Sequence, residues 1–208
     1  MKQILVLVFI ILSVTCLSFL VGQKKTIYPE VGKKCSDYFF HEIQYYRATS
    51  ASISELKGKW LVLDCWNRYC TSCTNAFPHT DSLARQFSAT ATILLVGYTG
   101  HQYSSVMYHP SDDSAIHHMY DSLRLTEHLS LPIAYDSSFF HLNDIGGCPY
   151  VIIIDPQGIV RAITDTFSAS NLTDLFNGGS PKLEKVYRTH EPGSAWMRYH
   201  PNYHSDSQ

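Results

Sequence analysis

The sequence predicts an α/β fold with a mixed central sheet flanked by helices. Two short apolar runs, 60–66 and 91–98, have the length and composition of buried strands. Helical spacing of apolar residues follows each run, and two further β-rich runs flank the turn Pro156-Gln-Gly158. Strands that alternate with helices pair in parallel, whereas the final hairpin adds antiparallel strands. These observations favour a layered α/β domain.

The composition is typical of one globular domain with appendages. The chain has 208 residues, of which 45% are apolar and 16% charged, so it has enough apolar mass for a hydrophobic core. Lys and Arg number 16 and Asp and Glu 18, so the net charge is −2 and nothing favours a nucleic-acid partner. We expect a monomer in which residues 32–178 form the domain and residues 180–208 form a C-terminal tail of low order.

The first 22 residues are predicted to be an export segment. Lys2 precedes an apolar run, residues 4–21, which is the pattern of a secretory signal. The run is close to the roughly 20 residues that span a bilayer, so an uncleaved anchor is an alternative. A third alternative is that Cys16 carries a lipid, although the residues before it do not fit the usual lipidation motif. All three predict export to the bacterial periplasm or the outer face of the inner membrane, where disulfides persist.

Each element of the predicted domain has its own local signal. Apolar runs bounded by turn residues predict strands, and apolar residues three and four apart predict helices. In the first half of the domain we expect an early strand or hairpin in 34–46, one or two helical turns over 52–57 from a capping box, a buried strand over 60–66, and a helix from Cys70 that Pro78 interrupts and kinks. A strand over 91–98 and a helix over 112–125 follow. The second half is expected to contain a short strand over 131–135, a short helix or turn over 139–145, a hairpin from 150–155 and 159–164, and a closing helix around 172–176.

The spacing Cys70-Thr-Ser-Cys73 is the strongest chemical signal in the chain. It lies where a predicted strand gives way to a helix, so backbone N–H groups and the helix dipole favour a thiolate there. Two intervening residues allow the second sulfur to reach the first, as disulfide exchange requires. Half of a zinc site is the competing interpretation, but no second Cys pair completes it. We therefore predict redox chemistry with no metal and no cofactor.

Residues 61–73 resemble the active-site strand and loop of the thioredoxin superfamily. The stretch from Gly147 to Gly158 is similar to the family's cis-proline loop and hairpin, and residues 53–59 resemble the exported, membrane-tethered TlpA/ResA-like thiol-disulfide oxidoreductases. The likeness covers roughly residues 32–176 and implies a thioredoxin-like fold with an N-terminal hairpin extension. Around the cysteine pair, the residues that match the family pattern are Asp64, Trp66, Tyr69 and Pro78.

The resemblance implies a role for each site residue. Cys70 is expected to be the exposed attacking thiol, Cys73 the buried resolving thiol, and Asp64 a carboxylate whose pKa is raised by burial and which exchanges a proton with Cys73. A surface Asp at the strand end is the alternative. Pro149 is expected to follow a cis peptide bond and to present the backbone of residue 148 to substrate. The expected substrate surface comprises Cys148, Pro149, Trp66, Tyr69, Thr71 and Ser72, with Trp66 and Tyr69 alternatively core aromatics.

The chain departs from the family pattern at several positions. The dipeptide 71–72 contains neither Pro nor His, and because this pair tunes the reduction potential, reductant and oxidant both stay open. ResA-like proteins often carry a glutamate where this chain has Ala76, so one carboxylate is expected to serve alone. Cys148 is either a third redox thiol or a small buried residue. Cys35 and Cys65 either pair with each other or stay reduced.

The resemblance implies that this protein is exported and reduces protein disulfides, and that a membrane electron donor then reduces the Cys70–Cys73 pair again. A disulfide oxidase or isomerase with the same site is one alternative, and a non-catalytic binding module of this fold is another. A copper- or haem-assembly factor is a third alternative. Peroxidase chemistry is not favoured, since a peroxidase of this superfamily needs a hydroxyl residue where the chain has Asn67.

Overall fold

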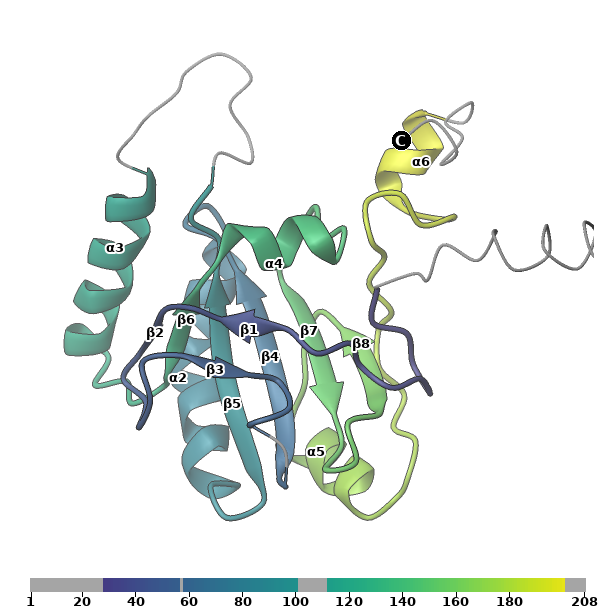
Figure 1. Ribbon diagram of the computed structural model, residues 1–208, viewed down its shortest axis with the longest axis horizontal. Coiled ribbons are helices and arrows are strands. Elements are labelled where there is room, and N and C mark those ends of the chain that lie inside the picture. The colour runs from purple at the N-terminus through teal and green to yellow at the C-terminus, as the bar shows by residue number, and fades with distance from the viewer. Residues whose placement is uncertain (1–27, 57, 101–111, 201–208) are drawn as a thin grey trace, which may run out of the picture.

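A six-stranded mixed sheet forms the centre of the computed structural model, which describes residues 28–56, 58–100 and 112–200 (Figure 1). The inner strands β6, β5 and β4 run parallel, and β2, β7 and β8 pair antiparallel with their neighbours. The predicted mixed sheet is therefore confirmed. From edge to edge its order is β2 (Ile43–Gln44), β6 (Ile133–Tyr135), β5 (Ala91–Gly97), β4 (Trp60–Trp66), β7 (Tyr150–Ile154) and β8 (Val160–Thr164).

Both faces of the sheet are buried, which explains why its strands read as continuous apolar runs. Along β4, Val62 and Trp66 belong to one core cluster, whereas Leu63 and Cys65 belong to the other. The first cluster also holds apolar residues of α2 (Thr71–Gln86), α3 (Asp112–Thr126) and α5 (Ala169–Phe176), and the second holds those of α4 (Ser137–Leu142) and of the N-terminal strands. Helices thus flank the sheet, as in Figure 1.

The N-terminal extension forms a small sheet of its own in front of the central one (Figure 1). Strand β1 (Phe39–Phe40) pairs antiparallel with β3 (Ala51–Ser52), while β2 between them joins the central sheet beside β6. The hairpin extension predicted from the resemblance is present.

One or two helical turns were predicted over 52–57, and the structure shows a single turn, in which the Leu56 N–H donates to the Ser52 carbonyl at 3.2 Å. Ser52 and Glu55 do form the reciprocal bonds of a capping box, because the Ser52 N–H donates to Glu55 Oε2 at 2.7 Å and the Glu55 N–H donates to Ser52 Oγ at 3.2 Å. The segment nevertheless closes only one turn, since Ser52 ends β3 and Gly58 adopts a φ of +98° just before β4 begins. Too few residues separate the two strands for a second turn.

The long helix that starts after Cys70 runs through Pro78 to Gln86. Pro78 was expected to interrupt and kink this helix, and α2 continues through it without a break. The other predicted helices and strands are present with boundary shifts of a few residues.

The C-terminal residues were expected to have low order, and up to residue 200 this is wrong. Lys185 forms an antiparallel bridge with the last residue of β8, and the Thr189 N–H donates to the Asp144 carbonyl at 2.9 Å. Ser194 caps α6 (Ala195–Tyr199), accepting from the Met197 N–H at 3.0 Å. Tertiary hydrogen bonds hold this segment, and a sequence without periodicity does not reveal them.

The predicted export segment, residues 1–22, lies outside the described residues. Among the described helices, none is sufficiently long and apolar to cross a membrane.

Candidate functional site

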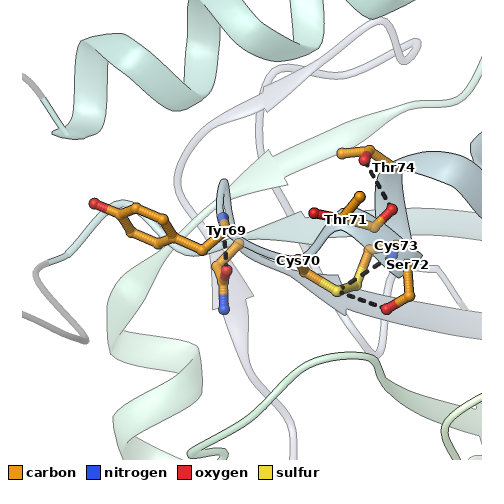
Figure 2. Close-up of a disulfide and its surroundings, with 7 residues drawn as sticks. Tyr69, Cys70, Thr71, Ser72, Cys73 and Thr74 are labelled. Carbon is orange, nitrogen blue, oxygen red and sulfur yellow. Dashed lines mark hydrogen bonds between the residues drawn. A yellow bond between two sulfur atoms is a disulfide. The ribbon is translucent and has the colours of Figure 1, made fainter.

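A disulfide between Cys70 and Cys73 lies where the chain leaves β4 and enters α2, with the two Cα atoms 5.2 Å apart (Figure 2). Cys70 is the N-cap of α2, and its Sγ accepts a hydrogen bond from the Cys73 N–H at 3.2 Å. In the reduced state this N–H and the positive end of the helix dipole would stabilise a thiolate at Cys70. The cysteine pair therefore lies at the start of a helix, as the sequence predicted.

Asn67 shapes the loop that presents the disulfide. Its Oδ1 accepts from the Tyr69 N–H at 2.9 Å, and its carbonyl accepts from the Cys70 N–H at 3.0 Å. These two bonds close a tight turn directly after β4. The Tyr69 side chain points away from the disulfide and is 56% exposed, so it is not a core aromatic (Figure 2).

The two residues between the cysteines face solvent. Thr71 and Ser72 are both exposed, and Ser72 Oγ lies 3.5 Å from Cys70 Sγ. The expected contrast between an exposed Cys70 and a buried Cys73 is small, because the two residues are 7% and 4% exposed. The physical reason is the disulfide itself, which holds the Cys70 sulfur against the first turn of α2.

Asp64 lies on the same face of β4 as Val62 and Trp66, the face that α2 covers, and it is 7% exposed. The interpretation of Asp64 as a surface residue is therefore wrong. It lines a cavity of about 340 Å³ together with Cys73 and Pro149. Burial in apolar surroundings raises the pKa of its carboxyl to about 7. A carboxyl with this pKa can accept or release a proton at neutral pH, as a general acid–base group must.

Two further titratable residues, neither of them predicted from the sequence, line the same cavity. Asp165 follows β8 directly, and its Oδ1 is buried with no hydrogen-bond partner in the described part of the chain. His79, six residues after Cys73 on α2, is exposed. The cavity also includes Ala76, the position at which the family pattern has a glutamate. No sequence signal marks Asp165, because only the sheet order β4-β7-β8 brings it near Asp64.

The Cys148–Pro149 peptide bond is cis. Pro149 lines the cavity with Cys73, which places the predicted cis-proline loop beside the disulfide. Cys148 is a half-buried thiol. Burial first and the Asp64 charge second raise the pKa of this thiol, while a hydrogen bond with Asn67 acts in the opposite direction. Because a thiol with a raised pKa stays protonated at neutral pH, Cys148 is a poor nucleophile in this environment.

The remaining cysteines do not pair with each other. Cys65 is a fully buried thiol, and Cys35 is a half-buried one. Burial first, then the charges of Cys148 and Asp64, raises the pKa of Cys65 well above its ordinary value. Of the two alternatives in the sequence analysis, the reduced state is the one that the structure shows.

Trp66 was expected to contribute to the substrate surface, and the structure contradicts this. Its side chain is 0% exposed and packs edge-on against Phe77 of α2, with ring centroids 5.1 Å apart. It lies beneath the disulfide loop because side chains alternate along β4, and its position faces α2. Trp66 therefore supports the site from below and is not accessible to a substrate.

The sheet order, the cis-proline loop and a Cys-x-x-Cys disulfide that caps a helix define a thioredoxin-like protein of the thiol-disulfide class. The chain matches the AhpC/TSA family over residues 31–163 and belongs to this family. The predicted resemblance to ResA-like proteins is confirmed by the relatives described next.

Two curated relatives come from Bacillus subtilis. The thiol-disulfide oxidoreductase ResA is 23% identical over 128 residues, which cover 60% of this chain and 64% of ResA. The thioredoxin-like protein YneN is 21% identical over 141 residues, covering 67% of this chain and 74% of YneN. The matched region thus spans less than two thirds of ResA.

Solved structures show the same fold. The thioredoxin domain of a thiol-disulfide oxidoreductase from Bacteroides vulgatus superposes with a TM-score of 0.52 at 16% identity, over 73% of this chain and 99% of that one. StoA from Bacillus subtilis superposes with a TM-score of 0.51 at 16% identity, over 71% and 99% of the respective chains. The predicted thioredoxin-like fold is therefore confirmed.

Proposed function

We propose that this protein is an exported thiol-disulfide oxidoreductase that reduces disulfides of other proteins. The observation that carries the proposal is the disulfide at the N-terminus of α2, which shares a cavity with a buried carboxyl of raised pKa at its Cys73 end. This arrangement supplies a stabilised thiolate at one cysteine and a proton acceptor at the other. Relatives named as thiol-disulfide oxidoreductases support the same chemistry.

The reaction begins with the reduced pair. The Cys70 thiolate attacks one sulfur of a substrate disulfide, a mixed disulfide forms, and the second substrate sulfur leaves as a thiolate that takes a proton. Asp64, as carboxylate, then accepts the proton of Cys73. The Cys73 thiolate attacks Cys70 Sγ and expels the first substrate sulfur. Two electrons have passed to the substrate, and the Cys70–Cys73 disulfide of the structure is the product.

The next turnover requires a reductant, and we propose a membrane electron donor. The proposal rests on the apolar run at residues 4–21, which would bring the domain to the outer face of the bacterial inner membrane or export it to the periplasm. A protease applied to intact spheroplasts should degrade the protein. Protection from the protease until lysis would contradict export.

The direction of transfer is tested by the reduction potential of the Cys70–Cys73 couple in glutathione or dithiothreitol buffers. We expect a potential near or below about −270 mV, the value of thioredoxin, as suits a reductant. A value near about −120 mV would instead make the protein an oxidant of dithiols. The absence of a two-electron couple would favour the non-catalytic binding module.

Trapping the mixed disulfide tests the roles of the cysteines. In the variant Cys73→Ser, resolution is blocked, so a covalent complex with a disulfide substrate should accumulate, and Cys70→Ser should form none. The matched control is Cys148→Ser. This variant should keep its rate of insulin reduction within about twofold, because a protonated thiol is not a nucleophile. A complex that survives in Cys70→Ser but not in Cys148→Ser would reassign the attacking thiol.

A further inference from the structure

The C-terminal segment, defined here as residues 185–200, packs against the cis-proline loop and leaves a groove of about 600 Å³ between them. Gly147, Cys148 and Pro149 line one side of this groove. Residues 186–189 and 193–196, with Arg198, supply the other side. The volume falls within the range of ordinary ligand sites. Figure 1 shows α6 beside the end of the sheet at which α4 lies.

We propose that the C-terminal segment is the second wall of the substrate groove and selects extended substrate segments that carry acidic side chains. This inference rests on the proposed function, because the substrate is a polypeptide held next to the disulfide. It gives a role to a part of the chain that a thioredoxin-like domain does not need.

The segment is held firmly against the loop that leads to Pro149. Asp144 accepts from the Thr189 N–H at 2.9 Å through its carbonyl and from the His190 N–H at 2.8 Å through its Oδ2. Its Oδ1 lies 2.7 Å from His190 Nδ1. Gly146 fits directly under the segment, since a Cβ there would lie 2.0 Å from Thr189 Oγ1. A wall fixed by this many contacts is preorganised for binding.

The groove connects to the reacting sulfurs. Pro149 belongs both to the groove and to the cavity that Cys73 lines. A substrate chain joined to Cys70 and extended along the backbone of residue 148 would therefore continue between the cis-proline loop and α6. Its residues flanking the reactive cysteine would contact the C-terminal segment.

The charges of the groove favour acidic partners. Among the described residues that line it, Arg188 and Arg198 are charged, and none is acidic. Arg188 is engaged, since its guanidinium lies over the Tyr28 ring at 4.3 Å and its Nε lies 3.7 Å from Glu191 Oε2. Arg198 on α6 is exposed and is the cation that a substrate can reach.

An aromatic side chain stands beside this cation. Trp196 stacks on His200 with ring centroids 4.2 Å apart and makes a T-shaped contact with His190, with centroids 4.5 Å apart. Trp196 is half-buried and lines the groove, so it offers a flat apolar surface for the stem of a bound side chain. An arginine beside a held aromatic ring is typical of residues that dominate recognition.

The test compares two disulfide-containing peptides of equal length in which the reactive cysteine is flanked by glutamates or by lysines. The full chain should reduce the acidic peptide with a kcat/KM about fivefold higher, and added salt should shrink the ratio. In Arg198→Glu the ratio should fall to one or invert. The matched control is Arg47→Glu, a charge reversal at an exposed arginine on the β2–β3 loop, at the opposite edge of the sheet, and it should keep the wild-type ratio.

Equal kcat/KM values for the two peptides in the wild-type protein, or an unchanged ratio in Arg198→Glu, would overturn the inference and leave the proposed function intact. Failure to reduce either peptide would instead contradict the proposed function. Binding of the same peptides with serine in place of cysteine, measured by fluorescence anisotropy, then decides the inference without any redox step. A preference for the acidic analogue that Arg198→Glu removes supports it, and equal binding of both analogues overturns it.

Discussion

The raised pKa of Asp64 is the property of a single residue on which the proposed mechanism most depends. Because burial moves the pKa of this carboxyl to about 7, it changes its protonation state in the range where the enzyme would work. The sequence resemblance implied a buried acid at this position. Its role in proton transfer from Cys73 stays a prediction that kinetics can test.

Replacing Asp64 with Asn should slow resolution of the mixed disulfide by about 100-fold, because the amide cannot accept the Cys73 proton. The measurement is the decay of a preformed mixed disulfide by stopped flow over a range of pH. The wild-type rate should rise as the pH increases through about 7, and the Asp64→Asn rate should lack this step. The same pH step in the variant would assign the proton acceptor elsewhere.

Asp165 is expected to pass the proton from Asp64 to solvent. Asp165 lines the shared cavity, and its buried Oδ1 has no hydrogen-bond partner in the described residues. Asp165→Asn should slow resolution about threefold to tenfold, and the double variant with Asp64→Asn should be no slower than Asp64→Asn alone, because the two residues act in series. Additive effects would show that Asp165 acts independently. His79→Gln, at the exposed side of the cavity, is the control and should change little.

At the scale of elements, the position of the C-terminal segment depends on a loop distant in sequence. Asp144 supplies both side-chain contacts to His190. It also has a φ of +54°, a conformation that glycine adopts without strain. The variant Asp144→Gly therefore removes the side-chain contacts to His190, and glycine adopts this backbone conformation without strain.

We expect Asp144→Gly to release the C-terminal segment while the central sheet stays folded. Tryptic cleavage after Arg188 should become several-fold faster, since exposure of a segment to protease follows its local stability. Asp121→Ala is the control, because it removes a comparable carboxylate contact, to Tyr45 at 2.6 Å, at the other edge of the sheet. Equal cleavage rates in the wild-type protein and Asp144→Gly would show that other contacts hold the segment.

At the scale of the whole molecule, the buried Asp64 makes folding depend on pH. The folded protein raises the pKa of this carboxyl from 3.8 to about 7, so it binds the proton more tightly than the unfolded chain does. The associated stability is full below about pH 4 and is lost as the pH rises through about 7. On the order of 4 kcal/mol of the free energy of unfolding is at stake.

The variant Asp64→Asn should consequently lose less stability between about pH 4 and pH 8 than the wild-type protein. At about pH 8 it should be the more stable of the two, because no buried charge forms. Urea unfolding of both oxidised proteins across this pH range measures the difference. Asp174→Asn, an exposed carboxylate on α5, is the control and should follow the wild-type curve. Parallel curves for Asp64→Asn and the wild-type protein would contradict the burial argument.

Local sequence patterns determined much of this protein. The apolar run 60–66, which β4 matches residue for residue, and the Cys70–Cys73 spacing were both readable, because a strand buried on two faces and a cysteine pair at a helix start are encoded by neighbouring residues. The capping box at Ser52 correctly predicted a helical turn, and its hydrogen bonds form there without a longer helix.

Only the tertiary structure decided which distant residues share the site. Asp165 reaches the cavity of Asp64 because β7 lies between β4 and β8 in the sheet. The C-terminal segment reaches the cis-proline loop through Asp144. The packing of Trp66 against Phe77 likewise depends on α2 covering this face of the sheet. These contacts join residues far apart in the chain, and no periodicity or short motif encodes such pairings, since packing and burial alone set them.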